Sequence, residues 1–191
     1  MDPRKGIIMF ELNENVVYPG HGVAVIEDII EKSVSGTSIK FLKLAFLFKD
    51  MTILVPVYNA ASIGLRKPSN QEVINSVIHE LNKQPERKLE SIDFTPSGWN
   101  RRNKDYQTRI QSGRLLEIAK IYRDLMHVAQ NKDLSFGERT LLQTTEELLA
   151  QELQVVQNEN RENVIQVLRG PFKQFVFHER NVLQESTSPA L

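Results

Sequence analysis

The sequence of 191 residues contains no cysteine. This absence excludes disulfide bonds, iron–sulfur clusters, thiolate zinc sites and cysteine catalysis. No apolar run approaches the roughly 18 residues that a membrane-spanning helix needs. The N-terminus also lacks the long apolar stretch of a signal peptide. We therefore expect a soluble cytoplasmic protein that does not contact membranes.

The sequence also lacks an excess of charge of one sign, with 24 Lys+Arg against 24 Asp+Glu. This balance argues against a uniformly basic protein that coats nucleic acid. The charges are nevertheless uneven, because residues 97–125 hold seven basic and three acidic side chains, whereas residues 126–168 hold three and seven. Binding to phosphates depends on the local field, so segment 97–125 is a candidate nucleic-acid surface. Helices can also carry such an excess by chance.

Motifs for catalysis, metal binding and cofactor binding are missing as well. The four histidines are scattered, with no pair at metal-ligand spacing, and no nucleophile elbow or Walker loop is present. Residues 20–22 (Gly-His-Gly) could begin a dinucleotide-binding loop, but that loop must open a helix. Residues 23–26 (Val-Ala-Val-Ile) are poor helix formers. We expect no enzyme, no cofactor, no metal and no small-molecule substrate.

The first third of the chain has the pattern of short β-strands. Turn residues at 19–22 and 35–38 separate apolar or alternating runs, which is typical of antiparallel hairpins. Four or five short strands are too few for a large sandwich and suit a small, strongly bent barrel. The predicted strands are residues 16–18, 23–30, 39–46 and 51–56, with a last short strand at 63–65.

After Pro68 the apolar residues recur with a helical period. Helices are expected from about residue 69 or 70 to 81, from 97 to 113, from 115 to 129, from 135 to 156 and from 161 to 168. Ser135 and Glu138 have the spacing of a capping box. The predicted protein is α+β: residues 1–68 form the antiparallel barrel, 69–96 a helix and a polar linker, 97–170 an all-helical bundle, and 171–191 a partly disordered tail.

The single tryptophan, Trp99, stands at the start of a predicted helix among small, polar and basic neighbours. A tryptophan in a protein core normally belongs to an apolar stripe, which is absent here. One interpretation is a wedge inserted at a base step in the minor groove, as apolar side chains do in several DNA-binding proteins. The other interpretation is that Trp99 covers the end of the helical core.

Several motifs in both halves of the sequence resemble the CarD/CdnL family of bacterial transcription regulators. They occur in the family's order and approximate spacing across residues 10–157. In the N-terminal half they are residues 16–23 (VVYPGHGV), 51–56 (MTILVP) and 63–66 (IGLR). In the C-terminal half they are residues 99–102 (WNRR), 112–113 (SG), 119–125 (AKIYRDL) and 134–139 (LSFGER).

This resemblance implies a Tudor-like barrel that binds the RNA polymerase β subunit, a module also found in the transcription-repair coupling factor. It further implies a helical domain that contacts promoter DNA at the upstream edge of the transcription bubble and stabilises the open complex, with little sequence specificity. By position, Trp99 is the minor-groove wedge, and the DNA contacts are Arg101, Arg102, Lys104 and Arg139. The polymerase-binding positions are Lys32, Val34 and Leu54.

Leu54 departs from the family pattern, because some members carry arginine there. If that arginine makes a salt bridge, this chain must bind polymerase through apolar or backbone contacts instead. Strand-edge pairing would supply them. Nothing in the sequence pattern demands a dimer, so we expect a monomer. The resemblance implies that it reaches the nucleoid through RNA polymerase holoenzyme.

Two other functions agree with the sequence. In the first, the protein is an adaptor whose barrel binds polymerase and whose helices bind another protein, for which the acidic segment 126–168 is suitable. In the second, the protein is a free-standing relative of the barrel of the transcription-repair coupling factor and acts on elongating polymerase. A contact with DNA that depends on Trp99 and weakens with salt distinguishes the DNA-binding function from the adaptor.

Overall fold

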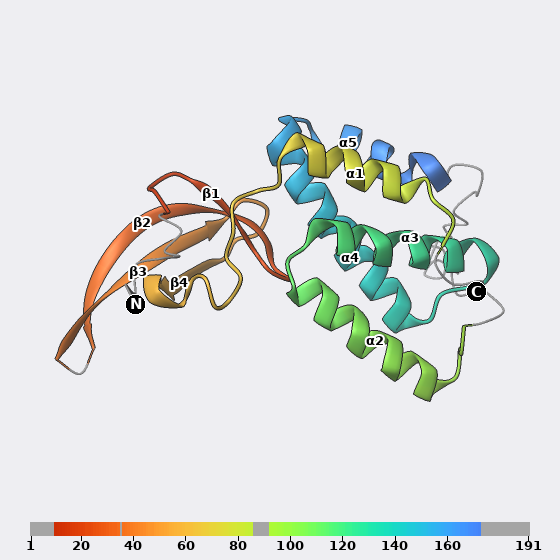
Figure 1. Ribbon diagram of the computed structural model, residues 1–191, viewed down its shortest axis with the longest axis horizontal. Coiled ribbons are helices and arrows are strands. Elements are labelled where there is room, and N and C mark those ends of the chain that lie inside the picture. Colours follow the sequence, from red (N-terminus) through yellow and green to blue (C-terminus); the bar gives the residue numbers. More distant parts are fainter. Residues whose placement is uncertain (1–9, 35, 86–91, 173–191) are drawn as a thin grey trace, which may run out of the picture.

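The computed structural model describes residues 10–34, 36–85 and 92–172. A curled β-sheet forms one end of the molecule and a group of helices forms the other (Figure 1). The predicted α+β fold is therefore confirmed. Part of the predicted linker, residues 86–91, and most of the predicted tail, residues 173–191, lie outside the described residues.

The sheet contains four antiparallel strands in the order β1-β2-β3-β4. Its core face buries Ile26, Leu42, Leu44 and Val55, which are at most 4% exposed. A bulge between Ile26 and Asp28 interrupts the pairing of β2 with β3, and bulges bend the strand that carries them. The sheet thus curls into a half-barrel around this core. The strands are β1 (Asn15–Tyr18), β2 (Gly22–Val34), β3 (Thr37–Phe46) and β4 (Thr52–Pro56).

The strand predicted at residues 63–65 is wrong. After β4 the chain forms a 3-10 helix, η1 (Val57–Asn59), and then a turn that includes Ile63 and Gly64. Leu65 is 2% exposed in the core of the sheet, and Arg66 makes a single bridge to Val17 of β1. The apolar residues of this segment therefore fill the end of the half-barrel without extending a strand.

Most of the helices begin at a side chain that caps the first turn. Asn70, Thr95, Ser135 and Asn160 each accept a hydrogen bond from a backbone N–H of the following helix, which satisfies a group that would otherwise lack a partner. The capping box predicted at Ser135 is present. The helices are α1 (Gln71–Leu81), α2 (Pro96–Gln111), α3 (Leu115–Asn131), α4 (Phe136–Gln157), α5 (Arg161–Arg169) and the 3-10 helix η3 (Gly170–Phe172).

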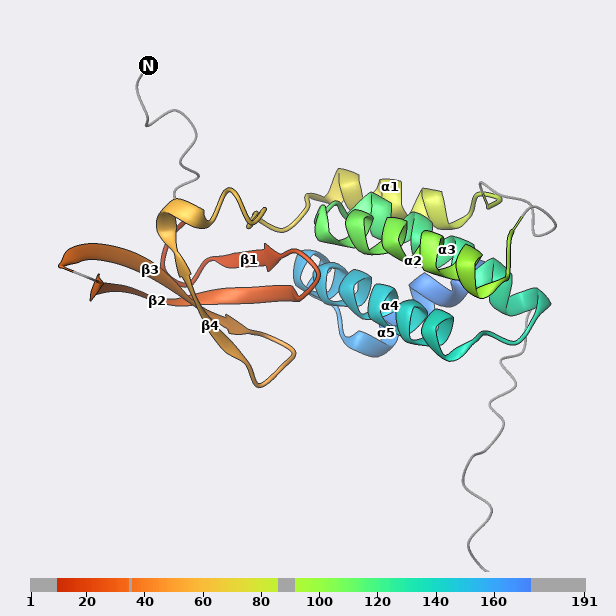
Figure 2. The same ribbon diagram turned by 90° about the horizontal axis from the view of Figure 1, so that it is seen from below.

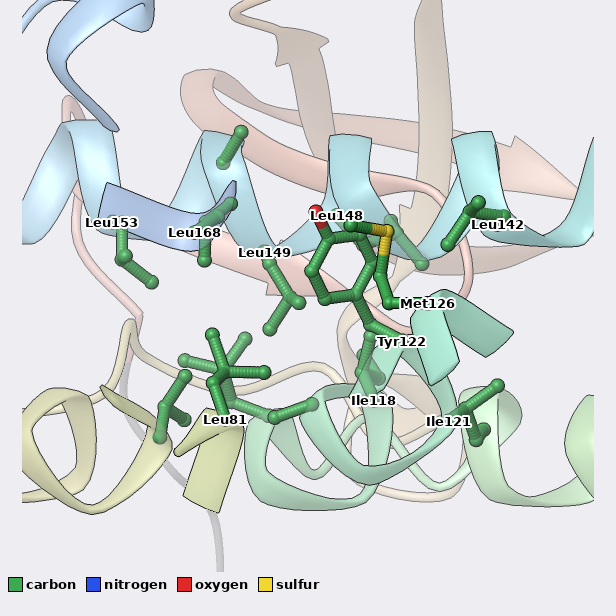
Figure 3. Close-up of a cluster of buried hydrophobic side chains, with 14 of the residues drawn as sticks. Leu81, Ile118, Ile121, Tyr122, Met126, Leu142, Leu148, Leu149, Leu153 and Leu168 are labelled. Carbon is green, nitrogen blue, oxygen red and sulfur yellow. The ribbon is translucent and has the colours of Figure 1, made fainter. Parts of the chain in front are cut away.

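The core of the helical domain lies around α4, which contacts α1, α3 and α5. Figure 3 shows Tyr122 and Met126 of α3 close to Leu148 and Leu149 of α4. The Tyr122 hydroxyl donates to a carboxylate oxygen of Glu146 at 2.8 Å, so this ring is buried with its polar atom satisfied. In the described parts of the chain, no helix combines the length and the hydropathy needed to cross a membrane.

The turn at residues 19–22 lies against α4. Gly22 has a positive φ of 103°, and a Cβ atom there would lie 1.9 Å from the Gln151 side-chain oxygen. The backbone N–H of Val23 donates to that same oxygen at 3.2 Å. Only glycine permits both this backbone conformation and this approach. The glycine-rich turn therefore joins the sheet to the helical domain.

A partly buried ion pair joins the two domains beside this turn. Arg66 makes two parallel hydrogen bonds to the Glu152 carboxylate, at 2.7 and 2.8 Å, and Glu152 is 2% exposed. Arg66 also donates to the Gly113 carbonyl at 2.8 Å, and the Ser69 N–H donates to Glu152 at 2.7 Å. Bidentate pairs of this kind fix geometry. The sheet consequently holds the helical domain in a defined orientation.

Candidate nucleic-acid interface

Trp99 lies in the first turn of α2, at the end of the helical domain farthest from the sheet. Both α2 and α4 begin at this end (Figures 1 and 2), which we call the distal end. Thr95 caps α2 by accepting from the Gly98 N–H at 3.1 Å, and Pro96 occupies the first turn. The Trp99 side chain is partly buried and packs against the helical core.

The first turn of α4 supports the indole ring. A Cβ atom on Gly137 would lie 2.8 Å from Cζ2 of Trp99, so the ring rests directly on the α4 backbone. The interpretation that Trp99 covers the end of the helical core agrees with this packing. The ring is only partly buried, so some of its surface remains accessible, and its insertion into DNA stays a prediction.

Gly137→Ala tests this support directly. Alanine favours a helix over glycine by roughly 0.5–1 kcal/mol, so propensity alone predicts a more stable α4. The added Cβ instead has to displace the Trp99 ring, because 2.8 Å is too short for a contact between two non-bonded carbon atoms. Since Trp99 is the only tryptophan in the chain, its fluorescence reports on this ring alone. We expect a red-shifted emission maximum with unchanged helix content by circular dichroism. An unshifted maximum would contradict the contact.

Arg102, predicted to contact DNA, is 8% exposed and is held within the protein. Its guanidinium donates to the Asp93 carbonyl and to the Glu138 carboxylate, the latter at 3.3 Å. Its Cζ lies 5.7 Å from the centroid of the Trp99 ring, within the range of a cation–π contact. Arg102 therefore supports the Trp99 ring from within the protein. Too little of its side chain is exposed to bind a DNA phosphate, contrary to the prediction.

Glu138 connects the groups beneath Trp99. Its carboxylate, 3% exposed, accepts from Arg102, from the Ser135 N–H at 3.0 Å and from the Lys132 ammonium at 3.1 Å. Burial raises the pKa of this carboxyl, but the hydrogen bonds from Ser135 and Lys132 outweigh burial and hold the pKa below its usual value. Glu138 therefore stays ionised and fixes the start of α4 to α2.

Three predicted DNA contacts are exposed: Arg101 and Lys104 on α2, and Arg139 on α4. Arg101 lies 3.8 Å from the Asp93 carboxylate with a side chain that is 80% exposed. Arg139 donates to the Leu134 carbonyl at 3.0 Å. These cations lie on the two helices that carry and support Trp99. The structure thus places three exposed cations on α2 and α4 near the first turns of these helices.

Most of the other cations of segment 97–125 form ion pairs within the helical domain. Arg123 is 1% exposed and pairs with Glu80 and Asp124. Arg109 and Lys120 both pair with Glu117, at 2.9 and 3.3 Å. A count of the basic residues in this segment therefore overestimates the positive charge that the protein exposes to solvent.

Two phenylalanines at the distal end were missed by sequence reasoning. Phe94 is 41% exposed and lies beneath the Lys132 ammonium, 4.3 Å from its ring centroid. Phe136, the first residue of α4, is 86% exposed. Its place directly after the N-cap Ser135, outside the apolar stripe of α4, is the signal that could have identified it.

The predicted polymerase-binding residues lie on the sheet. Lys32 and Val34 belong to the end of β2 beside the β2–β3 turn, and Lys32 is exposed. Leu54, 40% exposed, lies on β4 opposite Lys43 of β3. The cross-strand register places Lys32 and Leu54 on the face opposite the core, because their β3 partners, Ile39 and Lys43, are four positions apart. They share a face of the sheet without forming one cluster.

Two family models match the chain, one on each domain. The model of the CarD-like/TRCF RID domain matches residues 10–69, and the model of the CarD C-terminal domain matches residues 77–169. The protein is thus a two-domain regulator that combines a RID-type sheet with a CarD-type helical domain. The chain belongs to the CarD/CdnL family of transcription regulators.

A relative from Bacillus subtilis (strain 168) agrees with this assignment. YdeB, whose name describes it as a candidate transcription factor, is 28% identical to the chain over 148 residues. The matched region covers 78% of this chain and 92% of YdeB. The similarity therefore extends over both domains.

Proposed function

We propose that the sheet binds the β subunit of RNA polymerase while the distal end binds promoter DNA at the upstream edge of the melted region. The observation that carries the proposal is the distal end itself, where Trp99 is supported by Gly137 and Arg102 and accompanied by exposed cations. The exposed part of Trp99 is the minor-groove wedge. The protein acts as a cytoplasmic monomer within the polymerase complex.

The β4 edge supports the proposed contact with polymerase. β4 is the last strand in the order of the described sheet, so its outer edge can pair with a strand of another protein. Leu54 provides an apolar side chain at that edge. Backbone hydrogen bonds and this side chain can supply affinity without the arginine that some family members carry.

The rigid connection between the domains explains how binding to polymerase assists binding to DNA. Gln151, Arg66 and Glu152 hold the sheet against the helices, so a docked sheet presents the distal end at one defined place. A ligand shifts an equilibrium by its difference in affinity for the two states and by no more. A wedge with a few phosphate contacts favours melting by about 1–3 kcal/mol, or 5- to 150-fold.

The test is the lifetime of the open complex on a promoter with the cognate holoenzyme after addition of a competitor. We expect the full chain to lengthen this lifetime, and we expect it to bind the isolated β subunit. Binding to the β subunit without any change in lifetime would contradict the DNA-binding function and favour the adaptor.

Lys104→Ala tests the phosphate contacts. Losing one contact should weaken DNA binding equally for all sequences and reduce the slope of log affinity against log salt by about 1. Arg161→Ala, the same change of charge on α5, is the matched control and should leave the slope unchanged. Equal slopes for Lys104→Ala and the unmodified chain would exclude this contact.

The ion pairs of segment 126–168 favour the DNA-binding function over the adaptor. The acidic residues of segment 126–168 largely pair with cations of the same chain: Glu138 with Arg102, Glu146 with Arg169, Glu147 with Arg161 and Glu152 with Arg66. Their charges stabilise contacts between helices and between domains. Four of the seven acidic residues in this segment are therefore engaged within the chain, which leaves fewer of them available to a basic partner.

A further inference from the structure

Phe136 is the most exposed large apolar side chain in the described part of the molecule, at 86%. A single exposed apolar residue needs no explanation by itself. Phe136, however, directly precedes Gly137, on which the Trp99 ring rests. Bond lengths and the Cα spacing place the Phe136 Cα within roughly 8 Å of the Trp99 ring edge.

The two aromatic residues are exposed to very different degrees. Much of the Trp99 side chain is buried against Gly137 and the helical core, whereas almost all of the Phe136 side chain is exposed to solvent. The larger apolar surface at the distal end therefore belongs to Phe136. A wedge formed by Trp99 alone would leave this ring in water beside the DNA.

The backbone that carries Phe136 is firmly held. Ser135 accepts from the Glu138 N–H at 3.3 Å, and Glu138 accepts from the Ser135 N–H at 3.0 Å. Glu138 is in turn tied to Arg102 and Lys132. Only the side-chain torsions of Phe136 have to be fixed on binding, and an aromatic ring with two such torsions loses little entropy.

We propose that Phe136 stacks on an unpaired base of the melted promoter next to the step opened by Trp99. This inference rests on the proposed function and assigns a ligand, an unpaired base, to a second aromatic residue. A flat ring stacks on any base, which suits a contact with little sequence preference. Arg139, exposed three residues later on α4, lies on the same side of the helix and can bind the adjoining phosphate.

The experiment measures open-complex lifetime with holoenzyme and the full chain carrying Phe136→Ala, Phe136→Leu, Phe136→Tyr or Trp99→Ala. Phe136→Ala should shorten the lifetime about five-fold or more, the lower end of what stacking one base contributes. Phe136→Tyr should keep the full lifetime, and Phe136→Leu should behave like alanine. Val167→Ala, which removes a 45% exposed side chain on α5, is the control and should change nothing.

A second measurement locates the base. Abasic sites are placed one at a time along the unpaired DNA, and at one position the difference between Phe136→Ala and the unmodified chain should disappear. If that difference persists at every position, or if leucine replaces phenylalanine fully, Phe136 contacts something other than a base and the inference fails.

The two proposals fail differently. A shortened lifetime for Trp99→Ala with no change for Phe136→Ala overturns base stacking and leaves the wedge in place. No change for either variant overturns the wedge, and the inference about Phe136 with it.

Discussion

Trp99→Ala is expected to return the open-complex lifetime most of the way to its value without the protein, while binding to the polymerase β subunit stays intact. The whole effect of the protein should be about 5- to 150-fold, and the wedge interacts only with the melted state. Trp99 is in the first turn of α2, and that end of α2 lies away from the sheet, so its removal should leave the proposed polymerase-binding surface unaltered. The measurement is lifetime after competitor challenge, with β-subunit affinity determined in parallel.

Trp99→Phe is the matched variant, because it retains a flat apolar ring on Gly137. We expect this variant to keep a substantial part of the effect. An unchanged lifetime for Trp99→Ala, with the variant folded and bound to polymerase, would exclude Trp99 as the wedge.

Glu138→Gln is expected to reduce the free energy of unfolding by about 3–5 kcal/mol, the usual cost of removing one partner from a buried ion pair. The change removes the Glu138 charge that faces the 8% exposed Arg102 guanidinium and the Lys132 ammonium, whereas the glutamine amide oxygen can still accept from the Ser135 N–H. Urea unfolding followed by circular dichroism measures the loss. Glu162→Gln, an exposed position in the first turn of α5, is the control and should cost little. Equal losses for the two variants would contradict the role of Glu138.

The same carboxylate makes stability depend on pH. Because the folded protein lowers the pKa of Glu138, the contribution to stability is complete above the ordinary glutamate pKa of about 4.3 and is lost as pH falls through the folded value. As pH falls through the acid range, the free energy of unfolding should therefore decrease more steeply for the unmodified chain than for Glu138→Gln. Parallel profiles would exclude this linkage.

Local patterns in the sequence were sufficient to predict most of the elements. The alternation of residues 39–46 and the turns on either side predicted β3, and the capping box at Ser135 predicted the start of α4. Residues 63–65 misled the strand prediction because their apolar side chains fill the end of the half-barrel. Burial against neighbouring elements produces apolar runs in turns as well as in strands.

Site residues were harder to predict, because a side chain's role depends on what lies behind it. Arg101 and Arg102 are neighbours in the sequence, but one is exposed on α2 and the other is buried against Glu138, 36 residues away. No spacing rule within α2 distinguishes them. Glu138 was identified as a capping residue, yet its contacts with Arg102 and Lys132 become visible only when α2 and α4 are packed together.

The sequence by itself determined the order of the elements, the two-domain organisation and the family, since these follow from local periodicity, turn residues and motif order. The tertiary structure alone decided which cations remain on the surface, what Trp99 rests on and why Gly22 is required. Each of these depends on contacts between residues distant in the chain, such as Gly22 with Gln151 and Trp99 with Gly137. Steric fit and ion pairing across such distances act only once the chain has folded.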